Sequence, residues 1–147
     1  MRQCIKEAQA ASARGEVPVG ALIVDPSTNI VIARTGNSPI SICDPTGHAE
    51  ILALRDAAYK CGNYRLTGLT MYVTLEPCAM CAGAIAHARI TRLVYGASDP
   101  KGGAVEHGVQ FFNSPSCHSK PAITTGIFAK ECGELLKDFF KAKRKAL

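Results

Sequence analysis

The segment Leu69-Thr70-Met71-Tyr72-Val73-Thr74-Leu75-Glu76-Pro77-Cys78-Ala79-Met80-Cys81 contains two different periodicities. From Leu69 to Leu75, apolar residues alternate with threonine and tyrosine, which is the two-residue repeat of a strand. Pro77 suits the start of a helix, which we expect to run from Cys78 to about Ala88. The segment therefore predicts a strand that passes directly into a helix.

Strand and helix patterns also alternate on both sides of this segment. A dense turn signal over 25–29 separates two apolar runs and predicts a hairpin. The expected helices cover 1–14, 48–60, 78–88 and 128–140, and the expected strands cover 17–24, 30–33, 69–75, 92–97 and part of 121–127. This alternation predicts an α/β domain with helices on both faces of one sheet.

Length and composition favour one globular domain that spans residues 1–147. Hydrophobic residues make up 47% of the chain, which is enough for a core. No apolar stretch reaches the roughly 20 residues that cross a bilayer, so we expect no membrane association. The first residues do not resemble a secretory signal. We therefore expect a cytoplasmic location.

The chain contains seven cysteines, an odd number. A reducing compartment disfavours disulfides, so metal binding or catalysis is the leading explanation for some of them. Two cysteines, Cys78 and Cys81, stand in a C-x-x-C motif. We expect the other five to be small buried hydrophobic residues, namely Cys4, Cys43, Cys61, Cys117 and Cys132.

His48, Cys78 and Cys81 are the candidate metal ligands. A spacing of three residues places both sulfur atoms on one face of a helix, and the helix N-terminus favours the thiolate form. Two thiolates and one imidazole suit tetrahedral zinc, and three protein ligands leave the fourth position open, as in catalytic sites. We expect one zinc ion per chain. The alternative is a closed structural site with a fourth ligand such as Cys43.

Glu50 lies two residues after His48. In a regular helix these side chains point about 200° apart, so they serve one site only if His48 lies in an irregular first turn or if the pocket wraps around the helix start. If they converge, the carboxylate is placed to accept a proton from an activated water. Together the residues match H-x-E…P-C-x-x-C, the signature of zinc deaminases that act on nucleobases.

The C-terminal end is strongly basic. Lys141, Lys143, Arg144 and Lys145 supply four of the five net positive charges of the chain. Such a tail contacts a polyanion or is simply a solvated helix end that complements the helix dipole. The tail alone does not distinguish the two interpretations.

Over nearly its whole length the chain resembles the bacterial tRNA adenosine deaminase family. The deaminase motif is shared with cytidine and guanine deaminases, whereas Asn63-Tyr64-Arg65-Leu66 and Asp138-Phe139-Phe140 point to the tRNA branch. Further matching stretches are Gly15-Glu16-Val17-Pro18-Val19-Gly20-Ala21, Asp44-Pro45-Thr46 and Gly96-Ala97-Ser98-Asp99-Pro100-Lys101.

The resemblance implies a fold, a reaction and a partner. The fold is a cytidine deaminase-like three-layer α/β/α sandwich with a central mixed sheet of about five strands, assembled as a homodimer. The reaction converts the wobble adenosine of a tRNA anticodon, mainly in an arginine tRNA, to inosine. His48, Cys78 and Cys81 would hold zinc, zinc hydroxide would attack C6, and Glu50 would shuttle protons.

The resemblance also assigns residues to the RNA. Asn37 would help hold the flipped nucleotide. Asp99, Lys101, Phe140 and Arg144 would lie beside the anticodon loop.

Other residues of the region have simpler interpretations, and two other functions remain open. We interpret His87, His107 and His118 as structural or surface residues, and Glu76 as a satisfied polar group. A deaminase of a free base or nucleoside, such as guanine or cytosine, would share the zinc site but not need the basic tail. A zinc-stabilised RNA-binding module would not need Glu50.

Overall fold

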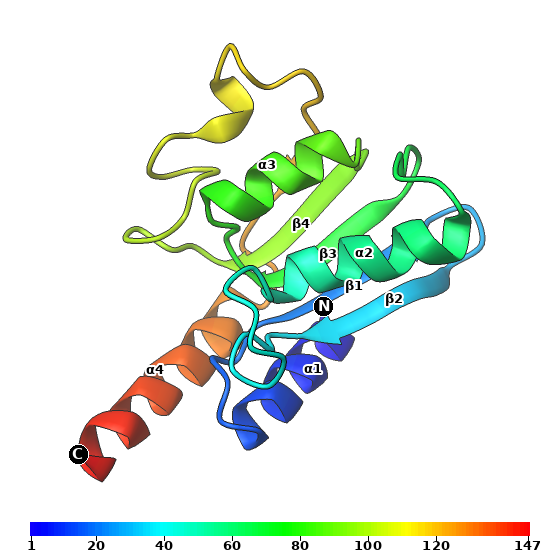
Figure 1. The fold of residues 1–147 in the computed structure, drawn as a ribbon. Coiled ribbons are helices and arrows are strands. Elements are labelled where there is room, and N and C mark those ends of the chain that lie inside the picture. The colour runs from blue at the N-terminus through cyan, green and yellow to red at the C-terminus, as the bar shows by residue number, and fades with distance from the viewer.

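The computed structural model describes residues 1–147. Five strands form one sheet in the order β2-β1-β3-β4-β5, and four α-helices pack on it (Figure 1). The strands are β1 (Gly20–Asp25), β2 (Ile30–Gly36), β3 (Thr70–Leu75), β4 (Arg92–Ala97) and β5 (Ala122–Thr124). The helices are α1 (Arg2–Ala13), α2 (Ala49–Cys61), α3 (Ala79–His87) and α4 (Ala129–Ala146), with a short 3₁₀ helix at Phe111–Asn113.

The sheet is mixed, as predicted. β1 pairs antiparallel with β2 and with β3, whereas β3 pairs parallel with β4, and β4 with β5. The predicted hairpin joins β1 to β2, and its turn is fixed by Asp25, whose carboxylate accepts hydrogen bonds from the backbone and hydroxyl of Ser27. The parallel pair β3–β4 requires a crossover connection, which α3 supplies.

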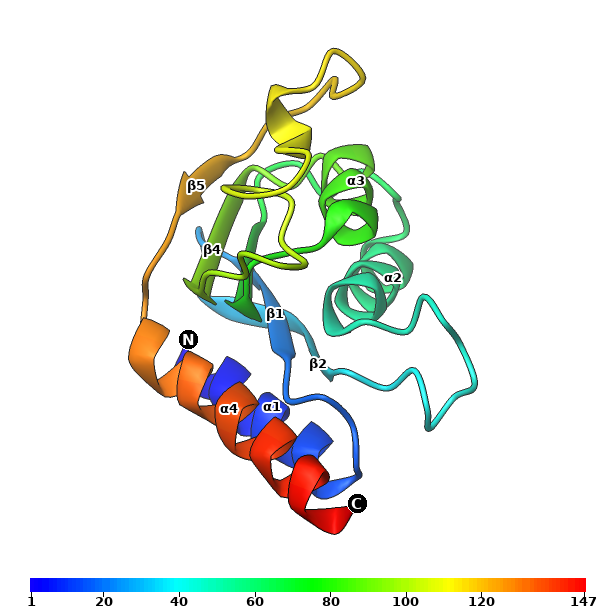
Figure 2. The same ribbon diagram turned by 90° about the vertical axis from the view of Figure 1, so that its left-hand side faces the viewer.

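Helices cover both faces of the sheet, so the molecule has three layers (Figure 2). α2 and α3 lie on one face, and α1 and α4 lie on the other. Because both faces are covered, even the threonines of β3 are buried. Thr74 uses its hydroxyl oxygen to accept a hydrogen bond from the backbone N–H of Gly20 at 3.2 Å. The predicted three-layer α/β/α architecture is confirmed.

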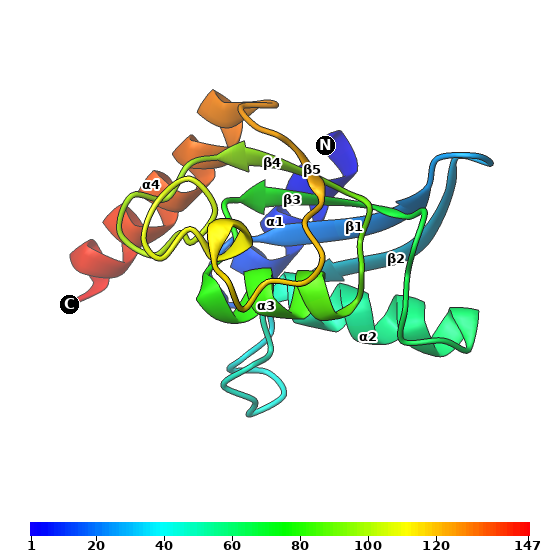
Figure 3. The same cartoon turned by 90° about the horizontal axis from the view of Figure 1, so that it is seen from above.

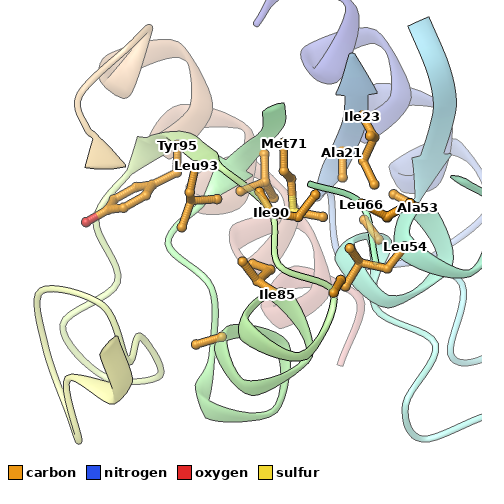
Figure 4. Packing of buried hydrophobic residues seen from close by; sticks show 14 of the residues in the cluster. Ala21, Ile23, Ala53, Leu54, Leu66, Met71, Ile85, Ile90, Leu93 and Tyr95 are labelled. Atoms are coloured by element: carbon orange, nitrogen blue, oxygen red, sulfur yellow. The ribbon is translucent and has the colours of Figure 1, made fainter. Parts of the chain in front are cut away.

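The main apolar core lies between the sheet and the layer formed by α2 and α3. Leu54 from α2 and Ile85 from α3 lie against Ile23, Met71 and Leu93 from three adjacent strands (Figure 4). All five side chains are buried. Burial of each such side chain contributes about 1.5–3 kcal/mol, so this layer holds α2 and α3 firmly on the sheet.

This packing brings the starts of two helices to one edge of the sheet, namely the edge formed by the ends of the strands and not by an outer strand. The carboxyl ends of β3 and β4 lie at the same edge as the first turns of α2 and α3 (Figure 3). The loop 37–48 leads into α2, and the loop 98–110 leaves β4 at this edge. Ligands of open α/β sheets bind at this edge, where strands end and helices begin.

Element boundaries differ from the sequence predictions in three places. β1 begins at Gly20 rather than at residue 17, because the backbone N–H of Val19 bonds to the carbonyl of Val17 and turns the chain before the strand. β2 extends to Gly36. α4 extends to Ala146 rather than ending near residue 140. No helix of the chain has the length and apolar character needed to cross a membrane.

Candidate active site

His48 and Glu50 reach the same pocket because His48 lies just outside the helix. It is the N-cap residue of α2, with φ −70° and ψ 151°, and the helix begins at Ala49. The 200° separation within a regular helix therefore does not apply to this pair. Glu50 lies in the first turn and is only 4% exposed.

Asn37 fixes this first turn from outside the helix. Its side-chain oxygen accepts a hydrogen bond from the backbone N–H of Ala49 at 3.0 Å. The N-cap residue makes no side-chain cap bond of its own, so Asn37 satisfies one of the free N–H groups at the helix start. Asp44, in the loop before α2, accepts hydrogen bonds from the backbone N–H and the hydroxyl of Thr46.

The three candidate metal ligands converge. The Nδ1 atom of His48 lies 3.6 Å from the sulfur of Cys78 and 3.5 Å from that of Cys81, and the three donor atoms lie within 4.8 Å of one another. Around tetrahedral zinc, with bonds of about 2.0–2.1 Å to nitrogen and 2.3 Å to sulfur, neighbouring nitrogen and sulfur ligands lie about 3.6 Å apart. The donor set and its spacing therefore fit a zinc ion. Cys43 is exposed and does not belong to the group.

The charges around the group favour a thiolate beside a histidine. Hydrogen bonding with Cys81, and then with His48, lowers the pKa of Cys78 to about 4 although burial opposes this. The hydrogen bond with Cys78 raises the pKa of His48, and the hydrogen bond with Cys78 together with burial raises the pKa of Cys81. Burial raises the pKa of Glu50. The Cys78 thiolate is the form that binds a metal.

A pocket of about 240 Å³ opens over this group. It is lined by His48, Glu50 and Cys78, and two of the predicted substrate-binding residues, Asn37 and Asp99, form part of its wall. The remaining lining residues are Val17, Val19, Leu75, Glu76 and Gly102. The pocket thus combines the candidate metal group, a buried carboxyl and an apolar patch.

A larger groove of about 550 Å³ adjoins the pocket and shares Asp99 with it. Lys101 from the loop 98–110 and Phe140 from α4 line this groove, together with Lys137. Arg144 does not line it, but follows Phe140 by four residues on α4 and so continues the same helix face beyond the groove. Four of the five predicted RNA-contacting side chains therefore line the pocket or the groove, and the fifth lies beyond the groove on the same face of α4.

The remaining polar residues have structural roles or lie elsewhere. Glu76 is buried and satisfied by hydrogen bonds, as predicted, and His107 is one of its partners at 2.8 Å. His87 and His118 line a separate pocket with Arg89, away from the candidate metal group.

The expectation for the five cysteines outside the motif was partly wrong. Cys4 and Cys132 are buried, as expected, and Cys117 is half-buried. Cys43 and Cys61 are exposed, because one lies in the loop 37–48 and the other ends α2 at the surface.

Sequence reasoning missed a third buried glutamate, Glu16. Glu16 precedes β1 and is fully buried, and its carboxylate holds the loop 37–48 by hydrogen bonds. No local motif predicts this role, because the hydrogen-bond partners of Glu16 lie 24 and 25 residues away in the sequence.

Fold and site together define a deaminase with the cytidine deaminase-like fold. The MafB19-like deaminase family matches residues 1–144. A solved structure from a study of A-to-I editing by tRNA:A34 deaminases superposes with a TM-score of 0.90 at 51% identity, covering 92% of this chain and 97% of that one. A guanine deaminase from Bacillus subtilis superposes less closely, with a TM-score of 0.65 at 27% identity, over 98% of this chain and 90% of that one.

Sequence relatives identify the branch. A tRNA-specific adenosine deaminase from Agrobacterium fabrum is 51% identical over 98% of this chain and 93% of its own length. Its counterparts from Haemophilus influenzae and Bacillus subtilis are 49% and 39% identical, over 98% and 99% of this chain and 83% and 89% of their own lengths. The chain belongs to the tRNA-specific adenosine deaminase family.

Proposed function

We propose that this enzyme deaminates adenosine to inosine at the wobble position of a tRNA anticodon, with an arginine tRNA as the main substrate. The observation that carries the proposal is one pocket that joins the group His48, Cys78 and Cys81 to the buried Glu50 and opens toward a groove with lysines. Full-length relatives named for this activity support it.

The proposed chemistry uses one zinc ion, held by His48, Cys78 and Cys81. When bound there, zinc would lower the pKa of a water molecule to about 7 and would thereby supply the nucleophile for C6 of adenine. Glu50 would accept one proton from the attacking water and give it to N1 of the ring, and would then move the remaining proton of the new hydroxyl at C6 to the departing amine. Adenosine and water thus yield inosine and ammonia.

Recognition of the nucleotide is assigned to both walls of the pocket. We place the flipped base between Asn37 and Asp99, and the flanking anticodon nucleotides along Lys101, Phe140 and Arg144. A loop nucleotide leaves its stack at low cost, so a single-stranded anticodon suits a pocket of this small volume. The cations contact phosphates without reading sequence.

Three further parts of the proposal follow from the family. Residues 1–147 act as one deaminase domain, and the location is the cytoplasm, where tRNA is used. The homodimer stays a prediction. Sedimentation equilibrium of the zinc-loaded protein tests it by measuring the mass of the assembly in solution.

The second candidate function is deamination of a free base. The structural likeness to a guanine deaminase, which has 27% identity, favours it. A free base would occupy the pocket alone and leave the groove with Lys101 and Phe140 without a function.

One assay separates the two functions. The zinc-loaded enzyme is offered an arginine anticodon stem-loop with adenosine at the wobble position and, separately, free adenosine, guanine and cytosine. We expect inosine in the stem-loop alone. Turnover of a free base with an untouched stem-loop would overturn the proposal in favour of the second function.

A further inference from the structure

Glu76 occupies an unusual position between β3 and the start of α3. Its side chain is fully buried, and the candidate metal ligand Cys78 follows two residues later. One carboxylate oxygen accepts hydrogen bonds from the backbone N–H of Asp99 at 2.9 Å and from the Nδ1–H of His107 at 2.8 Å. This oxygen thus contacts both ends of the segment 99–107.

The second carboxylate oxygen contacts the C-terminal end of the same segment. It accepts hydrogen bonds from the backbone N–H groups of Val105, Glu106 and His107, at 3.1, 3.0 and 3.1 Å. A carboxylate offers about four lone-pair positions, so these contacts leave Glu76 no capacity to act as a base.

The segment wraps closely around this carboxylate. A Cβ atom on Gly103 would collide with the carboxylate of Glu76, so any larger residue there would force the segment or the carboxylate to shift. The backbone N–H of Ala104 also bonds to the carbonyl of Pro77 at 2.9 Å, so the loop is attached to the chain on both sides of the turn into α3. The loop has no strand or helix of its own between β4 and Phe111, so these bonds determine its shape.

The segment carries two of the proposed RNA contacts. The carboxylate of Asp99 accepts hydrogen bonds from the backbone of Lys101 and Gly102, at 3.2 and 3.0 Å. The backbone of Asp99 is itself held by Glu76. The position of Lys101 relative to Cys78 is therefore set through one buried carboxylate.

We propose that Glu76 is a positioning residue that fixes the substrate-binding segment 99–107 against the candidate metal group, and thereby controls binding of the RNA rather than the chemical step. This inference rests on the proposed function for its kinetic consequence. The attachment of the segment 99–107 to Glu76, called the clamp from here on, is a property of the fold. It can therefore be measured without substrate.

The test uses Glu76→Gln, which replaces one acceptor oxygen by an NH₂ group that faces backbone N–H donors. We expect faster amide hydrogen exchange at 99–107, unchanged zinc content, and a KM for the stem-loop raised about tenfold while kcat changes much less. Asp25→Asn is the matched control, because that carboxylate also accepts backbone hydrogen bonds but lies in the hairpin turn at the opposite edge of the sheet.

A milder variant guards against misfolding. His107→Ala removes one side-chain donor at a position that is 34% exposed, and we expect a smaller change in the same direction. Unchanged exchange at 99–107 in both variants would overturn the clamp, and a fall in kcat at constant KM would overturn the assignment to binding. A wild-type enzyme inactive on the stem-loop would contradict the proposed function, whereas the exchange data would still decide the clamp.

Discussion

The carboxylate of Glu16 accepts two hydrogen bonds from Ser41, one from its backbone N–H at 2.8 Å and one from its hydroxyl at 2.6 Å. A third comes from the backbone N–H of Ile40 at 3.2 Å. Glu16 precedes β1, and Ser41 lies in the loop that leads to His48. The loop that contributes Asn37 and His48 to the pocket is therefore also held by a buried carboxylate.

This contact makes stability depend on pH. Although burial raises its pKa, hydrogen bonding to Ser41 holds the pKa of Glu16 below its ordinary value. A carboxyl with a lowered folded-state pKa stabilises the fold above its unfolded-state pKa, and the contribution disappears as the pH falls through the folded-state pKa. We expect Glu16→Gln to be less stable than wild type in urea unfolding at pH 7, with a difference that shrinks below about pH 4. A difference of the same size at both pH values would contradict this, and Glu134→Gln, exposed on α4, is the control.

Replacement of Asn37 by alanine should destabilise the start of α2. The backbone N–H of Ala49 would lose its acceptor inside a buried region, which costs about 1–3 kcal/mol. Urea unfolding of the zinc-loaded protein measures the loss. Asn113→Ala, at an exposed position, should leave the unfolding midpoint unchanged. Equal midpoints for Asn37→Ala and wild type would show that the contact does not stabilise the helix start.

Metal content should depend on two cysteines and not on the others. We expect one zinc per chain by mass spectrometry, and loss of zinc and of activity in Cys78→Ser. Cys61→Ser changes an exposed thiol at the end of α2 and should retain both. A chelator should abolish activity, and equimolar zinc should restore it. Full zinc content in Cys78→Ser would refute the assignment of the ligands.

Glu50→Gln should separate metal binding from proton transfer. The side chain is not part of the group of ligand atoms, so zinc content should stay at the wild-type level. Loss of the proton-transferring carboxyl should lower kcat about 10²- to 10⁴-fold. Single-turnover formation of inosine in the stem-loop measures this step. Normal turnover would reject the proposed mechanism.

The sequence predicted the elements because they depend on local patterns, and it predicted the convergence of His48, Cys78 and Cys81 because together these residues match the signature H-x-E…P-C-x-x-C, although 30 residues separate His48 from Cys78. Alternation identified β3, and the helix signals placed both cysteines at the start of α3. The sequence could not predict whether His48 and Glu50 share a pocket, because this depends on the backbone dihedral angles of His48. Inside α2 its side chain would point away from that of Glu50, whereas as the N-cap residue it reaches the same pocket.

The clamps formed by Glu16 and Glu76 could not be predicted. Their partners are mostly backbone N–H groups, which every residue but proline carries and which therefore leave no pattern in a sequence. The partners also lie 23 to 31 residues away from Glu76 and 24 or 25 from Glu16. Only the tertiary fold brings them together.

The basic tail of α4 divides into two faces, and only one should bind RNA. Lys143 lies 5.5 Å from the centre of the Phe139 ring and lines a groove beside α1, whereas Arg144 continues the face of Phe140. We expect Arg144→Ala to weaken stem-loop binding and to reduce the slope of log affinity against log salt by about 0.7–0.9, and Lys143→Ala to change neither. Removal of residues 141–147 should weaken binding further while zinc content is retained. Fluorescence anisotropy over a salt series measures the slopes, and equal slopes for wild type and Arg144→Ala would show that this side chain contacts no phosphate.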